Sequence, residues 1–158
     1  MKRRKVLFVC TGNTCRSPMA EAIFRAEIKK RKIKFVDSAS AGIFAADSDS
    51  IHPLSAACLD ERKIDYSKFH PRQLKHKMLE TSFLVVCMTR EQKDLLKGSG
   101  NVYAVSDIIG FDVNDPYGGT LDEYRRAADE LQQTAIAIIE KFFAAEEMKE
   151  IELGGFIR

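Results

Sequence analysis

The chain has 158 residues, of which 45% are hydrophobic and 30% are charged. This length and composition are typical of one globular domain and exclude a largely disordered chain. Lysine and arginine number 25 against 23 aspartates and glutamates, and the resulting net charge of +2 is too balanced to indicate a nucleic-acid partner. We therefore expect one domain over residues 1–158, with residues 146–158 as a tail that no pattern assigns.

The beginning of the chain carries no pattern of a targeting or membrane segment. The apolar run after the basic start covers only Val6 to Cys10. This run is shorter than the core of a signal peptide and far shorter than a membrane span. We therefore expect a cytoplasmic protein without a membrane partner.

Cysteines and histidines limit the chemistry further. The four cysteines, at positions 10, 15, 58 and 87, form no CxxC pair, and a reducing cytosol would keep them as thiols. Cys58, on a predicted helix, and Cys87, in an apolar strand, are expected to be buried. His52, His70 and His76 lack the spacing of a zinc helix and are interpreted as surface residues, so we expect no metal and no other cofactor.

The first half of the chain alternates predicted strands and helices. The apolar, β-branched residues 6–9 predict a buried strand that opens into a loop. Ser17 and Pro18 are typical of an N-cap and a first helical turn, and apolar residues continue at helical spacing toward residues 29–32. A second strand is predicted over residues 35–39, broken at Ala41-Gly42. A polar loop and a helix over about residues 53–63 follow it.

The second half continues the alternation. Residues 83–88 form a continuous apolar run, which is typical of a central strand covered on both faces. A short helix over residues 91–97, ended by Gly98, and a fourth strand over residues 102–105 follow. Residues 107–119, rich in Asp, Gly, Asn and Pro, predict a loop. Thr120 and Glu123 predict a capping box for a long helix, whose apolar face carries Tyr124, Ala128, Leu131, Ala135, Ile138 and Phe142.

Alternation of this kind predicts an α/β fold, a doubly wound sandwich with helices on both faces of a parallel sheet. Ligands of such folds bind outside the carboxyl ends of the strands. Cys10 lies at the carboxyl end of the first predicted strand.

Residues 10–17, Cys-Thr-Gly-Asn-Thr-Cys-Arg-Ser, place a thiol and a guanidinium at the two ends of a short loop before a helix. A loop of this length can wrap one phosphate with its backbone N–H groups, and Arg16 can hold two phosphate oxygens. The same positive field stabilises a thiolate, so Cys10 is expected to be a nucleophile at neutral pH. We therefore predict an oxyanion site formed by Thr11, Gly12, Asn13, Thr14, Cys15, Arg16 and Ser17.

Thiolate attack on phosphorus gives a phosphocysteine, which water then hydrolyses. Ser17 can donate a hydrogen bond to the sulfur of Cys10, and Asn13 can brace the loop through its side-chain amide. Gly12 is expected where a side chain would obstruct the loop or where φ is positive. Cys15 has two interpretations, core packing or a resolving thiol that traps oxidised Cys10 as a reversible disulfide.

Phosphoryl transfer also needs an acid for the leaving group. Asp115 precedes Pro116 in a segment that follows the fourth predicted strand, and it is the best placed candidate. Taken alone the segment is an ordinary Asp-Pro turn, and only the cysteine loop makes it a candidate. Asp107 and Asp112 are weaker alternatives.

The run VLFVCTGNTCRSPMAEAIF, the Ser40-Ala41-Gly42 segment and the distant Asp115-Pro116-Tyr117 together resemble the low-molecular-weight protein tyrosine phosphatase family, over roughly residues 5–145. The resemblance implies a three-layer sandwich with a four-stranded parallel sheet in the order 2-1-3-4. It implies that the substrates are phosphorylated proteins. By resemblance, Cys10 is the nucleophile, Arg16 the phosphate clamp, Asp115 the general acid, and Asn13, Ser17 and Ser40 the supporting network.

Three departures bear on the substrate. Thr14 stands where tyrosine phosphatases of the family usually carry Ile or Leu, Gly118 follows Tyr117 where they commonly carry a second tyrosine, and Met88-Thr89 replaces the usual Met-Asp. The first two resemble the protein arginine phosphatases of Gram-positive bacteria. We therefore expect phosphoarginine as the substrate, with Thr14 and Tyr117 in the substrate pocket.

Three alternatives stay open at this point. A phosphotyrosine-specific phosphatase is the first of them. An arsenate reductase is less favoured, because its chemistry needs two further thiols close together and Cys58 and Cys87 are separated by a helix, a loop and a strand. Retention of thiol, arginine and acid argues against a non-catalytic phosphoprotein-binding module.

Overall fold

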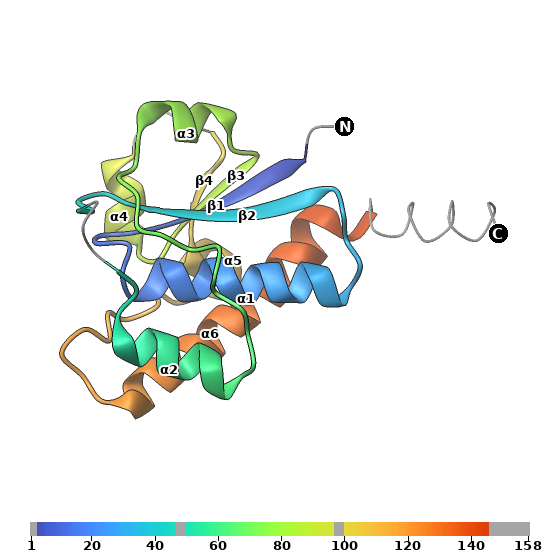
Figure 1. Cartoon of the computed structure of the whole chain (residues 1–158). Helices are drawn as coiled ribbons and strands as arrows, with labels where there is room; N and C mark the ends of the chain where they lie inside the picture. The colour runs from blue at the N-terminus through green and yellow to red at the C-terminus, as the bar shows by residue number, and fades with distance from the viewer. Residues whose placement is uncertain (1–2, 47–49, 97–99, 146–158) are drawn as a thin grey trace.

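The computed structural model describes residues 3–46, 50–96 and 100–145. The tail over residues 146–158 and the predicted helix end at Lys97 and Gly98 lie outside the described residues. Four parallel strands form one sheet in the order β2-β1-β3-β4 (Figure 1). The strands are β1 (Arg4–Cys10), β2 (Val36–Gly42), β3 (Leu84–Cys87) and β4 (Val102–Ala104). The implied strand order is therefore confirmed, with β3 in the interior of the sheet.

Alternate residues of β1 face two separate apolar layers. Val6, Phe8 and Cys10 belong to the larger core cluster, whereas Leu7 and Val9 belong to a smaller one on the opposite face. The expected three-layer arrangement is confirmed, since helices pack on both faces of the sheet.

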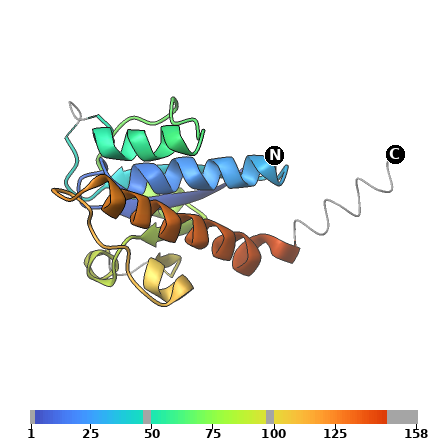
Figure 2. The same ribbon diagram turned by 90° about the horizontal axis from the view of Figure 1, so that it is seen from below.

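The larger cluster is covered by α1 (Arg16–Lys30), α5 (Val105–Ile109), α6 (Leu121–Ile138) and the π-helical turn Ile139–Phe143. The helix α2 (Pro53–Glu61) lies beside α1 and α6, as Figure 2 shows. The smaller cluster is covered by α3 (His76–Thr81) and by Leu96, which follows α4 (Arg90–Leu95). None of the helices in the described part of the chain has the length and apolar character that a bilayer crossing requires.

The start of the first helix differs from the prediction. The helix α1 begins at Arg16 with Cys15 as its N-cap, so Ser17 is a helical residue and not the cap. The Ser17 hydroxyl is buried and bonded to Cys10 and Asn13, which removes it from the capping role. Pro18 is tolerated because the first helical turn needs no N–H donor at that position.

Three further elements depart from the sequence-based prediction. The predicted strand break at Ala41-Gly42 is wrong, since β2 pairs with β1 as far as Gly42. The short helices α3 and α5 were not predicted, and α5 occupies the beginning of the segment assigned to a loop over residues 107–119. The capping box of α6 is confirmed, because Thr120 Oγ1 accepts the Glu123 N–H and Glu123 Oε2 accepts the Thr120 N–H.

Candidate active site

The cysteine loop (residues 10–17) connects the carboxyl end of β1 to the first turn of α1. Cys10 is buried at the end of β1, and its Sγ lies 2.9 Å from the hydroxyl oxygen of Ser17. Arg16 opens α1 and is also buried. The fold therefore brings the thiol, the hydroxyl and the guanidinium to the N-terminus of a 15-residue helix, where the helix dipole favours negative charge.

Asn13 fixes the shape of this loop. Its φ of 56° lies in the left-handed region, which asparagine adopts more readily than other non-glycine residues. Its Nδ2 donates to Ser17 Oγ at 2.7 Å and to Ser40 Oγ at 3.0 Å, and its Oδ1 accepts the Arg72 N–H at 3.0 Å. The three residues expected as a supporting network are thus in direct contact.

A buried carboxylate that the sequence analysis did not single out continues this network. Ser40 donates its hydroxyl proton to Glu21 Oε1 at 2.8 Å, and Arg25 donates to Glu21 Oε2 at 3.0 Å. Arg25 also donates to the Ser38 carbonyl at 2.5 Å. The sequence signal is a glutamate within the apolar run AEAIF, because a buried carboxylate needs partners.

The glycine that the loop requires is Gly42 rather than Gly12. A Cβ on Gly12 would meet only the Thr14 hydroxyl, at 3.6 Å, and Gly12 is not in the positive-φ region. The expectation for Gly12 is therefore wrong, because the tight position lies elsewhere. A Cβ on Gly42 would lie 2.9 Å from Asn13 N, Asn13 Cβ and the Gly12 carbonyl carbon. The close approach of β2 to the cysteine loop thus depends on a missing side chain.

The Asp115 loop (residues 112–119) lies over Arg16. The Arg16 Nη1 donates to the Val113 carbonyl at 3.0 Å, and its Nη2 is 3.8 Å from Asp115 Oδ2. The Asp115 side chain is 55% exposed, and its Oδ1 accepts the Tyr117 N–H at 3.0 Å. One carboxylate oxygen thus faces Arg16 at the cysteine loop, where an acid for a leaving group would have to be.

The two alternative acids are held elsewhere. Asp107 pairs with Lys93 and Arg90 and accepts the Ala104 N–H at 2.8 Å. The Lys93 hydrogen bond, with the Ala104 N–H and Arg90, lowers the pKa of Asp107 to about 2, so it does not carry a proton at neutral pH. Asp112 accepts the Arg90 N–H at 3.2 Å. The structure therefore favours Asp115 over both.

Aromatic side chains surround the loop. The His52 ring stacks on Tyr124, with ring centroids 5.1 Å apart, and meets Tyr117 edge-on at 5.9 Å. His70 and His76 are exposed as predicted, but the surface interpretation of His52 is wrong, because it is half-buried and caps α2 by accepting the Leu54 N–H. Tyr117 stays 72% exposed. Near the site, Tyr117 is thus an exposed aromatic ring, whereas Tyr124 is buried beneath the ring of His52.

Phe44 is a further exposed aromatic beside the loop that the sequence analysis missed. Its side chain is 77% exposed, and its N–H donates to the Thr11 carbonyl at 2.8 Å. Thr11 is held from the other side, where its Oγ1 accepts a hydrogen bond from Gln92 Nε2 at 3.2 Å. Gln92 belongs to the capping box of α4, in which Thr89 is the N-cap, so Thr89 fulfils a role that an aspartate could also fill.

Cys15 is packed against the α6 side of the core. Its Sγ lies 3.5 Å from the Tyr124 hydroxyl, and burial raises the pKa of its thiol despite that contact. Its carbonyl accepts a hydrogen bond from Ser55 at 3.1 Å. All four cysteines are free and buried, which confirms the expectation for Cys58 and Cys87. The packing role of Cys15 is visible, and its redox role stays a prediction.

Comparison with known proteins agrees with this geometry. A family model described as low molecular weight phosphotyrosine protein phosphatase matches residues 5–150. The sequence is 35% identical to the protein-arginine-phosphatase of Bacillus subtilis (strain 168) over 136 residues, covering 81% of this chain and 89% of that protein.

Solved structures give the same picture. A low molecular weight protein tyrosine phosphatase from T. tengcongensis matches with a TM-score of 0.82 at 36% identity, covering 88% of this chain and 99% of that one. A mutant of the arginine phosphatase YwlE with a phosphorylated active-site serine matches with a TM-score of 0.81 at 31% identity, covering 88% and 97%. Proteins named for either substrate are similar to this chain to the same degree, so identity alone does not choose between them.

Proposed function

The chain belongs to the low-molecular-weight phosphotyrosine protein phosphatase family and is a cysteine-dependent protein phosphatase, and on this premise we propose that Cys10 is its nucleophile, Arg16 its phosphate clamp and Asp115 its general acid. The observation that carries the proposal is the Cys10 Sγ to Ser17 Oγ distance of 2.9 Å beneath an arginine that also faces Asp115. A thiol, its hydrogen-bond donor, a cation and an exposed carboxylate thus surround the mouth of one loop.

In the first step, the Cys10 thiolate attacks phosphorus while Asp115 donates a proton to the leaving group. The hydroxyl of Ser17 stabilises the thiolate before attack and again when sulfur leaves. The backbone N–H groups of residues 11–17 and the Arg16 fork hold the equatorial oxygens. In the second step, water attacks the phosphocysteine, with Asp115 accepting its proton.

We further propose that phosphoarginine is preferred to phosphotyrosine. A guanidinium carries N–H donors that cost about 1 to 3 kcal/mol each when they are buried without a partner. Two acceptors are available, the carbonyl oxygen of the Asp115 carboxyl group and the half-buried Thr14 hydroxyl, whose one hydrogen-bond partner among the described residues is the Cys15 thiol at 3.8 Å. Phosphotyrosine needs apolar walls instead, and Gly118 beside Tyr117 supplies none.

Position 14 tests this preference most directly. In Thr14→Ile, kcat/KM for phosphoarginine peptides should fall about tenfold, the equivalent of one hydrogen bond, while the value for phosphotyrosine peptides is kept or raised. Thr14→Val, which removes only the hydroxyl, should lose phosphoarginine activity in the same way. Thr14→Ser should retain it.

The two parts of the proposal fail in different ways. An unchanged ratio of the two kcat/KM values in Thr14→Ile would mean that Thr14 only packs against α1, and the chain would be assigned as a tyrosine phosphatase. Loss of both activities in Thr14→Ser, with folding intact, would mean that the position supports the loop rather than the substrate. Neither result would contradict the roles proposed for Cys10 and Arg16.

Two other functions receive no support. Cys58 belongs to the core on the α1 side of the sheet and Cys87 to the core on the opposite side, so they do not form the thiol pair that arsenate reduction needs. A binding module would not need the exposed carboxylate facing Arg16.

Four free thiols, two of which serve or adjoin the proposed chemistry, fit a reducing compartment such as the cytoplasm.

A further inference from the structure

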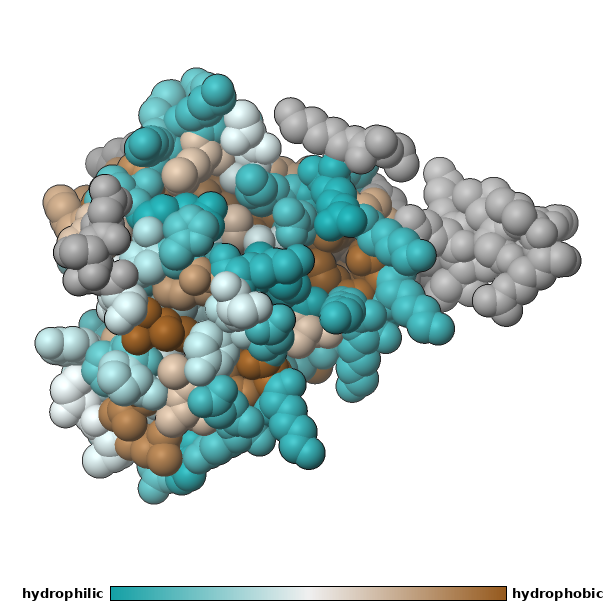
Figure 3. Space-filling model, in the orientation of Figure 1, coloured by the Kyte–Doolittle hydropathy of each residue, from teal (hydrophilic) through white to brown (hydrophobic). Residues whose placement is uncertain are grey.

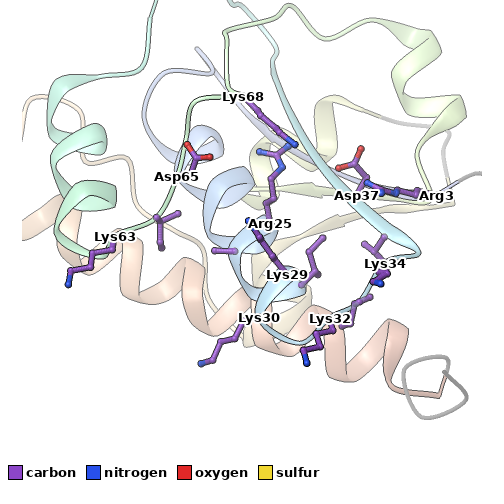
Figure 4. Close-up of a pocket in the computed structure, with 15 residues that line it drawn as sticks. Arg3, Arg25, Lys29, Lys30, Lys32, Lys34, Asp37, Lys63, Asp65 and Lys68 are labelled. Atoms are coloured by element: carbon purple, nitrogen blue, oxygen red, sulfur yellow. The ribbon is translucent and has the colours of Figure 1, made fainter. Parts of the chain in front are cut away.

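A cavity of about 650 Å³ lies at the end of the sheet opposite Cys10. Figure 4 shows the residues that line it, which come from the position before β1, the C-terminal half of α1, the turn between α1 and β2, the start of β2 and the segment after α2. β1 runs from Arg4, which follows the lining residue Arg3, to Cys10, and seven residues of strand span about 20 Å. The cavity is therefore separate from the active site.

The lining of this cavity, here called the basic pocket, is strongly cationic. Eight lining side chains are cationic and two are anionic, a net charge of +6, whereas the whole chain carries only +2. The cations are Arg3, Arg25, Lys29, Lys30, Lys32, Lys34, Lys63 and Lys68. The rest of the chain therefore has a net charge of −4, and the positive charge of the protein is concentrated at this end.

The two carboxylates offset only part of this charge, and the pKa of Asp65 is lowered by the hydrogen bonds from Ser67 and, after them, by Lys29 and Lys68. Asp37 Oδ1 accepts the Ser38 N–H and Asp65 Oδ1 accepts the Ser67 N–H, each at 2.8 Å. Of the eight cations, only Arg25 forms an ion pair within residues 3–46, 50–96 and 100–145, and its partner is Glu21 outside the pocket. The pocket thus keeps an excess of positive charges, which repel each other.

Helix stability alone does not explain this arrangement. Lys29 and Lys30 in the last turn of α1 interact favourably with the helix dipole and would be expected without any ligand. Arg3, Lys34 and Lys68 are not in α1, so the dipole gives no reason for them to converge on the same cavity. Cations from four segments thus converge on one cavity, and such an arrangement favours an anionic ligand.

The interior of the pocket is not wholly polar. Ala26, Ile28, Ile33, Val36 and Ile64 contribute apolar lining between the cations. Figure 3 shows the corresponding surface, over the C-terminal end of α1 and the start of β2, as hydrophilic side chains with hydrophobic patches between them. Arg25 is held in place by Glu21 and the Ser38 carbonyl, so the position of one guanidinium beside the pocket is fixed.

We propose that the basic pocket binds an organic polyphosphate, a compound that carries two or more phosphates on a flat, partly apolar body, as a nucleoside triphosphate does. The volume lies within the range of small-molecule sites, about 300 to 1,000 Å³. The cations suit the phosphate chain, and the apolar residues suit the body. A single phosphate would leave most of the positive charge uncompensated.

Calorimetry with the non-hydrolysable β,γ-imido analogue of ATP tests the proposal on the whole chain. Binding should persist in Arg16→Ala, in which the active site has lost its phosphate clamp. It should weaken about tenfold or more in Lys29→Glu/Lys68→Glu, and be unchanged in Lys75→Glu/Lys77→Glu, which alters the net charge equally at exposed lysines outside the pocket. Circular dichroism melting of each variant checks that it is folded.

Two further probes separate the parts of the ligand. Inorganic triphosphate should bind more weakly than the analogue, and adenosine should not bind measurably. Binding that disappears in Arg16→Ala but survives in Lys29→Glu/Lys68→Glu would place the ligand in the active site and overturn the proposal. The proposal would also be overturned if inorganic triphosphate and the analogue bound with equal affinity, or if both lysine double variants lost affinity equally. Either result would mean that the pocket is a non-specific charged surface.

Discussion

The cysteine loop and the Asp115 loop meet at Arg16, but they are built in opposite ways. In the cysteine loop, Asn13 and Ser17 are fully buried, and each bonds to another buried polar group. In the Asp115 loop, Asp115 is 55% exposed and Tyr117 is 72% exposed. The first loop is therefore braced from within before a ligand arrives, whereas the two side chains of the second that face the substrate side are open to solvent.

This difference matches the two tasks of a phosphatase. Charge develops on the same phosphate oxygens whatever the substrate, so donors aimed at them gain from being rigid. The leaving group differs between substrates, and the part that protonates and surrounds it gains from exposure and adjustment. The comparison predicts that damage to Cys10 or to its buried supports Asn13 and Ser17 affects all substrates equally, whereas damage to the Asp115 loop depends on the leaving group.

The largest effect is expected for Cys10→Ser. Turnover should fall by about 10⁴-fold or more, because a serine hydroxyl is a far weaker nucleophile than a thiolate. Phosphate or vanadate binding should stay measurable, since the loop N–H groups and Arg16 remain. Equilibrium binding of vanadate and steady-state rates on an aryl phosphate provide the two measurements. Appreciable turnover in a clean preparation would contradict the assignment of the nucleophile.

Asp115→Asn should have the next largest effect, and one that depends on the substrate. Loss of the proton donor should lower the rate of Cys10 phosphorylation about 10² to 10⁴-fold for poor leaving groups and much less for activated aryl phosphates. Pre-steady-state rates across a series of aryl phosphates measure this dependence. Equal losses across the series would indicate that Asp115 only supports Arg16.

Gly42→Ala should damage the rigid loop without touching a reacting group. The added methyl would lie 2.9 Å from Asn13 and Gly12 atoms, and overpacking of this kind costs about 1 to 3 kcal/mol of unfolding free energy. Urea unfolding measures this loss. Gly12→Ala is the matched control, since its nearest contact is 3.6 Å, and it should be the milder variant. The reverse order would mean that β2 does not limit the loop.

Features with a local sequence pattern could be predicted, and features that depend on contacts could not. The strands, the long helix and the cysteine loop were predictable because apolar runs, a capping box and a thiol with a guanidinium leave local patterns. The start of α1 was not, because the Ser17 hydroxyl is used by Cys10 and Asn13 rather than by a helix end. A serine that caps a helix and a serine that bonds to a distant side chain look the same in sequence.

Contacts between segments far apart in the chain could not be predicted from any sequence pattern. The closeness of Gly42 to Asn13 and the stack of His52 on Tyr124 join residues far apart in the chain. The helices α3 and α5 have six and five residues, too short for a helical period to stand out. The composition of residues 107–119 indicated a loop, and Asp107 instead stabilises the first turn of α5 by accepting the Ala104 N–H.

The smallest effect on activity is expected for Asp107→Asn. This variant distinguishes the structural role of Asp107 from the acid role proposed for Asp115. Activity should be unchanged, whereas the free energy of unfolding at pH 7 should fall by about 1 to 2 kcal/mol with the loss of the contacts to Lys93 and Arg90. Because those contacts lower the folded pKa of Asp107 to about 2, its contribution is complete above about pH 4 and is lost as the pH falls toward 2.

Urea unfolding of both proteins across this pH range checks the sign. The two stabilities should converge as the pH approaches 2. A constant difference between wild type and variant would mean that the carboxylate charge is not responsible. A loss of activity that depends on the leaving group, as expected for Asp115→Asn, would transfer the acid role to Asp107.

Identification of the phosphorylated intermediate tests the central claim most directly. The enzyme is mixed with an activated aryl phosphate, quenched in acid within the first turnover and digested, and the peptides are analysed by mass spectrometry. The account predicts one phosphoryl group per chain, attached to the sulfur of Cys10 and formed as fast as the first equivalent of phenol is released. A phosphoryl group on another residue, or phenol release without any phosphoenzyme, would contradict it.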